Sequence, residues 1–155
     1  MLGGVAAGLV SIPLTMFVES AALAAWEWLA PSVLLRPHVV LQSVQSNSNG
    51  GLANLALTSS AVLAAPLFEE TCFRGLLLGW LTWVTRRPMA ALVITSIAFG
   101  LTHSANPETV PPLILFGLIL GLVRLRWGLG AAIVTHALFN ARSMALVLLN
   151  PDLLH

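Results

Sequence analysis

Three ionisable residues stand close together in the segment FEETCFRG, inside an otherwise apolar part of the chain. Glu69 and Glu70 are adjacent, and Arg74 follows four residues after Glu70. Residues four apart share one face of a helix, and the order Glu before Arg is the favourable one. Glu70 is therefore expected to be neutralised by Arg74, whereas Glu69, rotated by about 100° around the helix, has no local cation. A carboxylate of this kind, held away from bulk water, is suited to act as a general base.

Two other apolar segments carry imidazole and amide groups. His103 ends the first of them, in FGLTH, and His136 and Asn140 stand four residues apart in HALFN. Because His136 and Asn140 share a helix face, they can present two donors to one point, as an oxyanion requires. His103 can share a water molecule with Glu69. Ionisable groups inside membrane helices are costly, and a functional role is their default interpretation.

Structural roles are the alternatives for each of these groups. Glu70 with Arg74 can be a purely structural ion pair, and a histidine inside a span is often a packing residue. His136 and Asn140 can also hold two helices together. Three separate helices place such groups at similar depths, which favours one shared site over three independent explanations.

The composition indicates a protein embedded in a membrane. The chain has 155 residues, of which 57% are hydrophobic and 8% are charged, whereas soluble domains contain about 25% charged residues. We therefore expect an all-α, polytopic membrane helix bundle of about five to six helices in contact with the lipid bilayer. The sequence contains no basic patch or arm, which argues against a nucleic-acid partner. The lack of lysine and the abundance of alanine and leucine indicate a GC-rich bacterial genome. Together with the apolar composition, this predicts a multi-pass protein of a bacterial cytoplasmic membrane.

Five apolar segments approach the length needed to cross a bilayer, which is about 20 residues. The second segment would measure about 50 Å as one helix. We expect it to break or bend near Pro66, which would leave FEETCFRG as a turn inside the protein. The tryptophans fall near the segment ends, as interface anchors do. The five segments are residues 2–29, 52–84, 89–105, 110–123 and 128–149.

Arginines near the segment ends indicate the orientation in the membrane. Arg86 and Arg87 follow the second segment, and Arg124 and Arg126 follow the fourth, so that two spans separate the pairs. Both pairs are therefore expected on the same side of the membrane. The positive-inside rule assigns that side to the cytosol.

The three motifs together resemble those of the CPBP family, which comprises CAAX proteases and bacteriocin-processing enzymes and is also called Abi. EETCFRG resembles E-E-x-x-x-R, FGLTH resembles F-x-x-x-H, and HALFN resembles H-x-x-x-N. The resemblance divides the chain into three parts. Residues 1–62 form an N-terminal membrane helix, a loop and the start of the second helix, residues 63–149 form the catalytic core, and residues 150–155 form a short tail.

The resemblance implies an intramembrane endopeptidase that acts on a membrane-associated peptide or protein substrate. It assigns activation of the attacking water to Glu69 and His103, and stabilisation of the oxyanion to His136 and Asn140. Glu70 and Arg74 would form a supporting ion pair. The residues implicated in this way are Glu69, Glu70, Arg74, His103, His136 and Asn140.

The sequence leaves metal dependence open. Glu69, His103 and His136 would supply one carboxylate and two imidazoles to a Zn²⁺ ion, with a fourth position for water. No H-E-x-x-H motif is present, however. We predict direct activation of water without a cofactor, with a zinc-dependent metalloprotease as the alternative.

Two other functions are compatible with the same residues. The shortness of the chain is compatible with a catalytically inactive membrane module, such as an immunity or partner-binding protein. The same Glu and His groups would also serve a small transporter or a proton relay. An aspartyl protease dyad is disfavoured because Asp152 is the only aspartate.

Overall fold

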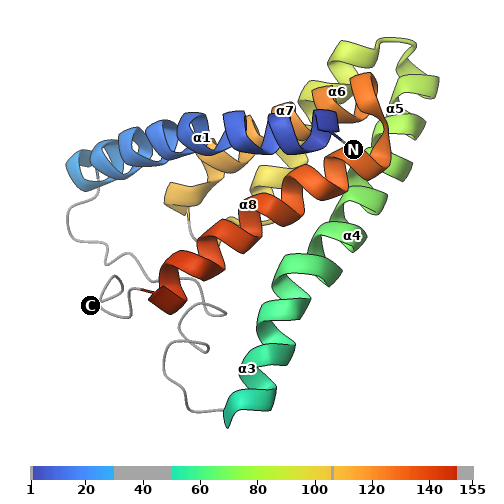
Figure 1. The fold of residues 1–155 in the computed structure, drawn as a ribbon. Helices are drawn as coiled ribbons and strands as arrows, with labels where there is room; N and C mark the ends of the chain where they lie inside the picture. Colours follow the sequence, from blue (N-terminus) through green and yellow to red (C-terminus); the bar gives the residue numbers. More distant parts are fainter. Residues whose placement is uncertain (1, 30–49, 106, 150–155) are drawn as a thin grey trace.

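The structure is a computed structural model that describes residues 2–29, 50–105 and 107–149, and within these ranges every regular element is a helix (Figure 1). The expected all-α helix bundle is therefore confirmed. The predicted loop within residues 30–49 and the predicted tail over residues 150–155 lie outside the described residues. The α-helices are α1 (Leu2–Leu29), α3 (Gly50–Ser59), α4 (Ala65–Glu70), α5 (Leu78–Thr85), α6 (Pro88–Leu101), α7 (Val110–Trp127) and α8 (Leu129–Leu149).

In the described parts of the chain, three stretches of helix are long and apolar enough to cross a membrane. They are Gly4–Ala25, Gly51–Thr85 and Pro107–Trp127, and Pro88–Leu101 is a shorter apolar helix. The last helix, α8, was expected to be a further span but is not among them. These findings support an integral membrane protein.

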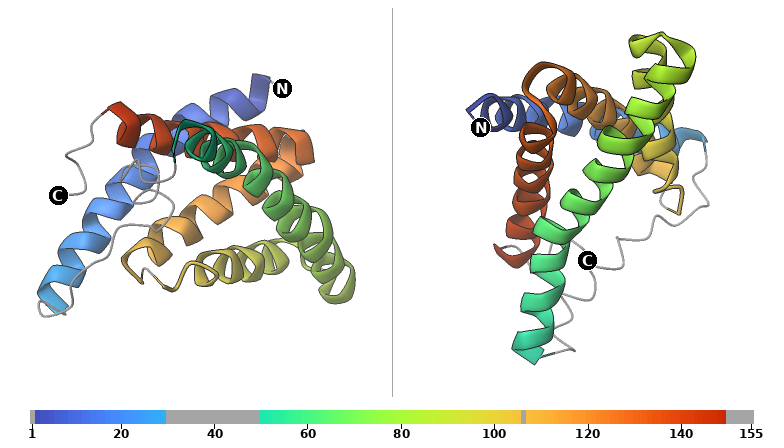
Figure 2. Two further views of the ribbon diagram at one scale, coloured as in Figure 1. Left: turned by 90° about the horizontal axis from the view of Figure 1, so that it is seen from below. Right: turned by 90° about the vertical axis from the view of Figure 1, so that its right-hand side faces the viewer.

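The second predicted segment is one uninterrupted helix from Gly50 to Thr85, and it runs along one flank of the bundle (Figures 1 and 2). A break at Pro66 and the turn expected over FEETCFRG are therefore wrong, whereas the alternative expectation, a bend, does not require the helix to be interrupted. Two π-helical stretches, Ser60–Ala64 and Thr71–Leu77, lie on either side of α4. The wider π turn before Pro66 accommodates the missing N–H of proline without ending the helix.

The remaining helices pack around α7, which contacts α1, α6 and α8. Glycines permit close approach of α7 to α6 and of α1 to α8. A Cβ atom on Gly117 of α7 would lie 3.1 Å from Cα of Ser96 in α6, and one on Gly4 of α1 would lie 2.6 Å from the carbonyl oxygen of Ala131 in α8. These helices therefore pack backbone against backbone, as in other membrane bundles.

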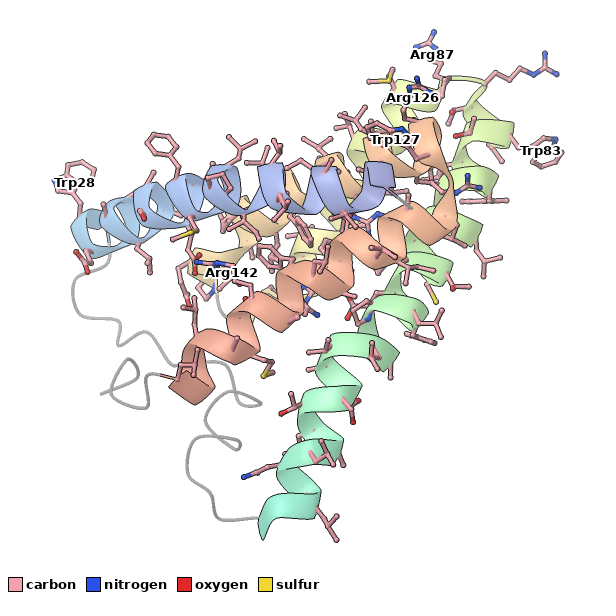
Figure 3. The ribbon with its side chains drawn as sticks, in the orientation of Figure 1. Trp28, Trp83, Arg87, Arg126, Trp127 and Arg142 are labelled. Atoms are coloured by element: carbon pink, nitrogen blue, oxygen red, sulfur yellow. The ribbon has the colours of Figure 1, made fainter. Side chains whose placement is uncertain are left out.

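Charged and aromatic side chains mark the ends of the bundle. Figure 3 shows Arg87, Arg126, Trp83 and Trp127 at one end, and Trp28 at the far end of α1. This arrangement agrees with the expectation that the two arginine pairs lie on the same side. Trp28, Trp83 and Trp127 are exposed, as expected of side chains at a membrane interface.

Candidate active site

A buried ion pair lies in the middle of the bundle. Arg74 Nη1 donates to Glu70 Oε1 over 3.0 Å, and the two side chains are 1% and 0% exposed. Arg74 Nη2 donates to the carbonyl oxygen of Gly117 in α7 over 3.1 Å, and the guanidinium carbon lies 4.4 Å from the centre of the Phe99 ring. The pair predicted from helix spacing thus forms, and it joins the long helix to α6 and α7.

His136 is bound to the same carboxylate. Its Nδ1 lies 2.9 Å from Glu70 Oε1, and since the ion-paired carboxylate accepts hydrogen bonds, we assign the Nδ1 proton to this contact. The rings of Phe99 and Phe116 pack edge to face against the imidazole, with centroids at 5.8 Å and 5.3 Å. These contacts hold the ring so that Nε2 points toward Glu69, whose Oε2 is 3.9 Å away.

Glu69 lies in a different environment from its neighbour Glu70. Its side chain is 27% exposed and lines a cavity of about 390 Å³ between the helices. The rotation of one residue around the helix therefore gives one buried, paired carboxylate and one carboxylate that faces open space. Besides Glu69, the polar residues that line the cavity are Thr15, Glu19, Ser60, His103, Thr109, His136, Asn140, Arg142 and Ser143.

His103 reaches this cavity from a turn and not from a helix. The third apolar segment was expected to be helical through residue 105, but α6 ends at Leu101 and residues 102–105 form a turn. His103 Nδ1 lies 3.2 Å from the carbonyl oxygen of Phe99 and 3.1 Å from Thr102 Oγ1. These contacts occupy Nδ1 and leave Nε2 for other partners.

Asn140 is anchored to the long helix through a backbone carbonyl group. Its Nδ2 donates to the oxygen of Ala61 over 2.8 Å. Ala61 lies in the π-helical stretch, where the N–H of Ala65 bonds to the oxygen of Ser60, five residues earlier. In this register the partner of the Ala61 carbonyl would be residue 66, which is Pro66 and has no N–H. Proline therefore leaves a carbonyl group that the Asn140 amide satisfies.

The three motifs thus converge, although the residues predicted as zinc ligands do not form a metal site. Glu69, His103, His136 and Asn140 line one cavity, and Glu70 and Arg74 lie directly behind His136. In the part of the chain that the structure describes, no three His, Cys, Asp or Glu side chains are grouped to hold a metal ion. Glu69, His103 and His136 therefore have suitable donor atoms for zinc but are not grouped as ligands of one ion in this structure.

The structure adds residues that the sequence did not single out. Phe99 contacts Arg74, His103 and His136, and its place as the first residue of the F-x-x-x-H motif was an available signal. Thr15 and Glu19 of α1 line the cavity, although α1 was expected to lie outside the catalytic core. No sequence pattern signals a contribution from α1.

The buried pair leads to a prediction about stability. Arg74→Ala would leave Glu70 without its cation in a low-dielectric site, and we expect it to lower the free energy of unfolding by about 3–5 kcal/mol. The measurement is the melting temperature and the yield of monodisperse protein in detergent. The matched control is Arg126→Ala, whose guanidinium is exposed and whose loss should cost less than about 0.5 kcal/mol. Equal melting temperatures for Arg74→Ala and the wild type would contradict the structural role of the pair.

The comparison with known proteins agrees with this geometry. A family model described as type II CAAX prenyl endopeptidase Rce1-like matches residues 51–142, which is more than half of the chain and includes all three motifs. No curated protein and no solved structure matches the chain. The match is consistent with the CPBP resemblance and supports a CAAX-type intramembrane endopeptidase in general terms. The chain belongs to the type II CAAX prenyl endopeptidase Rce1-like family.

Proposed function

We propose that this protein hydrolyses a peptide bond inside the membrane, with Glu69 as the general base. The observation that carries the proposal is the difference between two adjacent carboxylates. Glu70 is buried, and its Oε1 contacts both Arg74 and His136, whereas Glu69 faces the cavity and lies 3.9 Å from His136 Nε2. Family membership supports an endopeptidase in general, and the assignment of individual roles rests on these contacts.

The first chemical step is the attack of water on the substrate carbonyl carbon. Glu69 takes one proton from the water, the water oxygen bonds to the carbon, and the electron pair of the C=O double bond moves to the carbonyl oxygen. His103 orients the same water from the turn after α6. When the C–N bond breaks, Glu69 returns the proton to the leaving nitrogen, so that the base is regenerated.

The developing oxyanion is stabilised by His136 and Asn140. Asn140 uses one hydrogen of Nδ2 for the Ala61 carbonyl and retains a second for the oxyanion. His136 faces the oxyanion with Nε2, and donation from this atom requires a proton on each ring nitrogen, because Nδ1 donates to Glu70. Donors fixed before the reaction stabilise the transition state strongly because they need no reorganisation.

Replacement of the proposed base gives the most direct test. Glu69→Gln keeps the shape of the side chain but cannot accept the proton, so we expect cleavage to fall by a factor of about 10² to 10⁴. The assay is hydrolysis of a peptide with an S-prenylated cysteine by the purified protein in detergent, with the melting temperature measured in parallel. Glu27→Gln removes an exposed carboxylate of α1 and should cleave at the wild-type rate.

The alternative roles of Glu69 and the alternative functions of the protein predict different experimental results. Unchanged hydrolysis by Glu69→Gln would eliminate Glu69 as the base. An inactive module would cleave nothing in any variant, and a transporter would show flux in proteoliposomes without cleavage.

Pro66 is expected to act through Asn140. Pro66→Ala supplies an N–H that competes for the Ala61 carbonyl, which would release the Asn140 amide from its anchor. We expect kcat to fall by about tenfold, because a misplaced oxyanion donor loses part of its contribution, with little change in melting temperature. Pro88→Ala is the matched control, since Pro88 is exposed and opens α6. Equal kcat values for Pro66→Ala and the wild type would contradict this positioning role.

The proposed chemistry uses no metal ion. Because the candidate zinc ligands are not grouped around one point, we expect activity to survive dialysis against EDTA or 1,10-phenanthroline. The measurement is kcat/KM before and after dialysis, and again after addition of Zn²⁺. Loss of activity that Zn²⁺ restores would overturn the proposal of direct water activation.

A further inference from the structure

We propose that an anionic phospholipid binds between the start of α6 and the end of α7, with its phosphate group held by Arg87, Arg124 and Arg126. This inference does not depend on the proposed hydrolysis. It concerns arginines that do not line the cavity and that the three motifs do not include.

The contacts of two glycines show how α6 and α7 pair. Gly117 of α7 lies against Ser96 of α6. Gly121, one turn further along α7, lies against Leu92, one turn earlier in α6. The two helices are therefore antiparallel, and one more turn brings the end of α7 level with the start of α6.

This pairing brings three arginines to one level of the bundle. Arg124 and Arg126 lie in the last turn of α7, and Arg87 directly precedes α6. Figure 3 shows Arg87 and Arg126 at the same end of the molecule. The Arg87 N–H donates to Thr85 Oγ1 over 3.2 Å, and its carbonyl accepts from the N–H of Ala91 over 3.0 Å. Arg87 is thus held in a short turn beside the end of α7.

No carboxylate neutralises these arginines within the described residues. The cations of the ion pairs in these residues are Arg74 and His136. Arg124 is half-buried, and its Nε is shielded from solvent without a hydrogen-bond partner among the described residues. The described glutamates lie in the second half of α1, in the middle of the long helix and before the other end of α7, and they are Glu19, Glu27, Glu69, Glu70 and Glu108. Like charges gathered in this way repel one another, so that an external anion would stabilise them.

A phosphate group suits the donors that these arginines present. Guanidinium N–H groups form a rigid fork that matches phosphate oxygens. The guanidinium carbon of Arg126 lies 5.8 Å from the centre of the Trp127 ring, which is within the range of a cation–π contact. The ring offers no oxygen acceptor, and the N–H groups of Arg126 therefore remain available to a phosphate.

Apolar side chains around the arginines favour a lipid over a soluble phosphate compound. Trp83, Met89, Leu125 and Trp127 are all exposed at this end of the bundle. Such side chains can contact acyl chains while neighbouring cations contact the headgroup, and basic pockets between membrane helices bind anionic headgroups in this way.

Orientation in the membrane is the simpler explanation for arginines on this side. It requires only their presence in the connections between helices. It does not account for the convergence of two helix ends that carry three arginines and no described carboxylate. A shared phosphate would hold the start of α6 against the end of α7, and the lipid should therefore stabilise the fold.

The first test measures melting temperature in nanodiscs of phosphatidylcholine, with and without an added fraction of phosphatidylglycerol. We expect phosphatidylglycerol to raise the wild-type melting temperature by about 3 °C or more, as a ligand of the folded state does. Arg87→Gln and Arg126→Gln should each lose most of this rise. Arg87→Lys should retain part of it, because the charge remains but the fork does not. In phosphatidylcholine alone, Arg87→Gln should melt at or above the wild-type temperature.

Arg142→Gln is the matched control. Arg142 contacts Met16 of α1 and lies away from the end that carries Arg87 and Arg126 (Figure 3), so that its variant should keep the full rise. An equal loss in Arg142→Gln and Arg87→Gln would indicate a general attraction of cations to an anionic bilayer. That result, or equal wild-type melting temperatures in the two lipid mixtures, would overturn the inference.

A binding measurement identifies the ligand directly. Quenching of tryptophan fluorescence by dibrominated phosphatidylglycerol, compared with dibrominated phosphatidylcholine, reports the lipid beside Trp83 and Trp127. We expect the wild type to prefer the anionic lipid by about fivefold and Arg126→Gln to show a ratio near one. Absence of a preference in the wild type would contradict the inference.

The source of the phosphate is tested with glycerol 1-phosphate, the headgroup chemistry without acyl chains. Added to the protein in phosphatidylcholine nanodiscs, it should leave the melting temperature unchanged. A rise equal to that given by phosphatidylglycerol would assign the site to a soluble phosphate compound and overturn the assignment to a lipid.

Discussion

The rest of the site depends on the contacts of one buried group, the Glu70 carboxylate. It accepts from Arg74 on its own helix and from His136 on α8 through the same oxygen, and Arg74 also reaches the carbonyl of Gly117 on α7. A buried charge is tolerated only when its partners are well placed. The requirement to satisfy this carboxylate therefore specifies the relative positions of three helices.

A carboxylate that faces the cavity and one that is buried in an ion pair can be adjacent in sequence, because a helix separates their directions. Glu70 points into the bundle and is fully buried, whereas Glu69 lines the cavity and retains 27% exposure. The imidazole of His136 connects them, with Nδ1 toward Glu70 and Nε2 toward Glu69. The ion pair thus orients a group that faces the cavity, in the way that outer groups orient ligands and bases in other sites.

Irregular helix geometry contributes to the site as much as side-chain chemistry does. The π-helical turn before Pro66 leaves the Ala61 carbonyl without a backbone partner, and Asn140 occupies it. The early end of α6 places His103 in a turn, where Phe99 and Thr102 hold Nδ1. Departures from ideal helix geometry therefore position two of the four motif residues that line the cavity.

The amino-acid sequence alone determined the membrane class, the helical content and the pairing of Glu70 with Arg74, because these follow from apolar segment length and from helix periodicity. It did not determine the continuity of the long helix at Pro66, the turn at His103 or the part played by α1 in the cavity. The helix around Pro66 and the place of α1 involve contacts between residues far apart in the chain, such as Asn140 with Ala61 and Gly4 with Ala131. Local patterns define which face of a helix is polar, whereas only the packed bundle decides which faces meet.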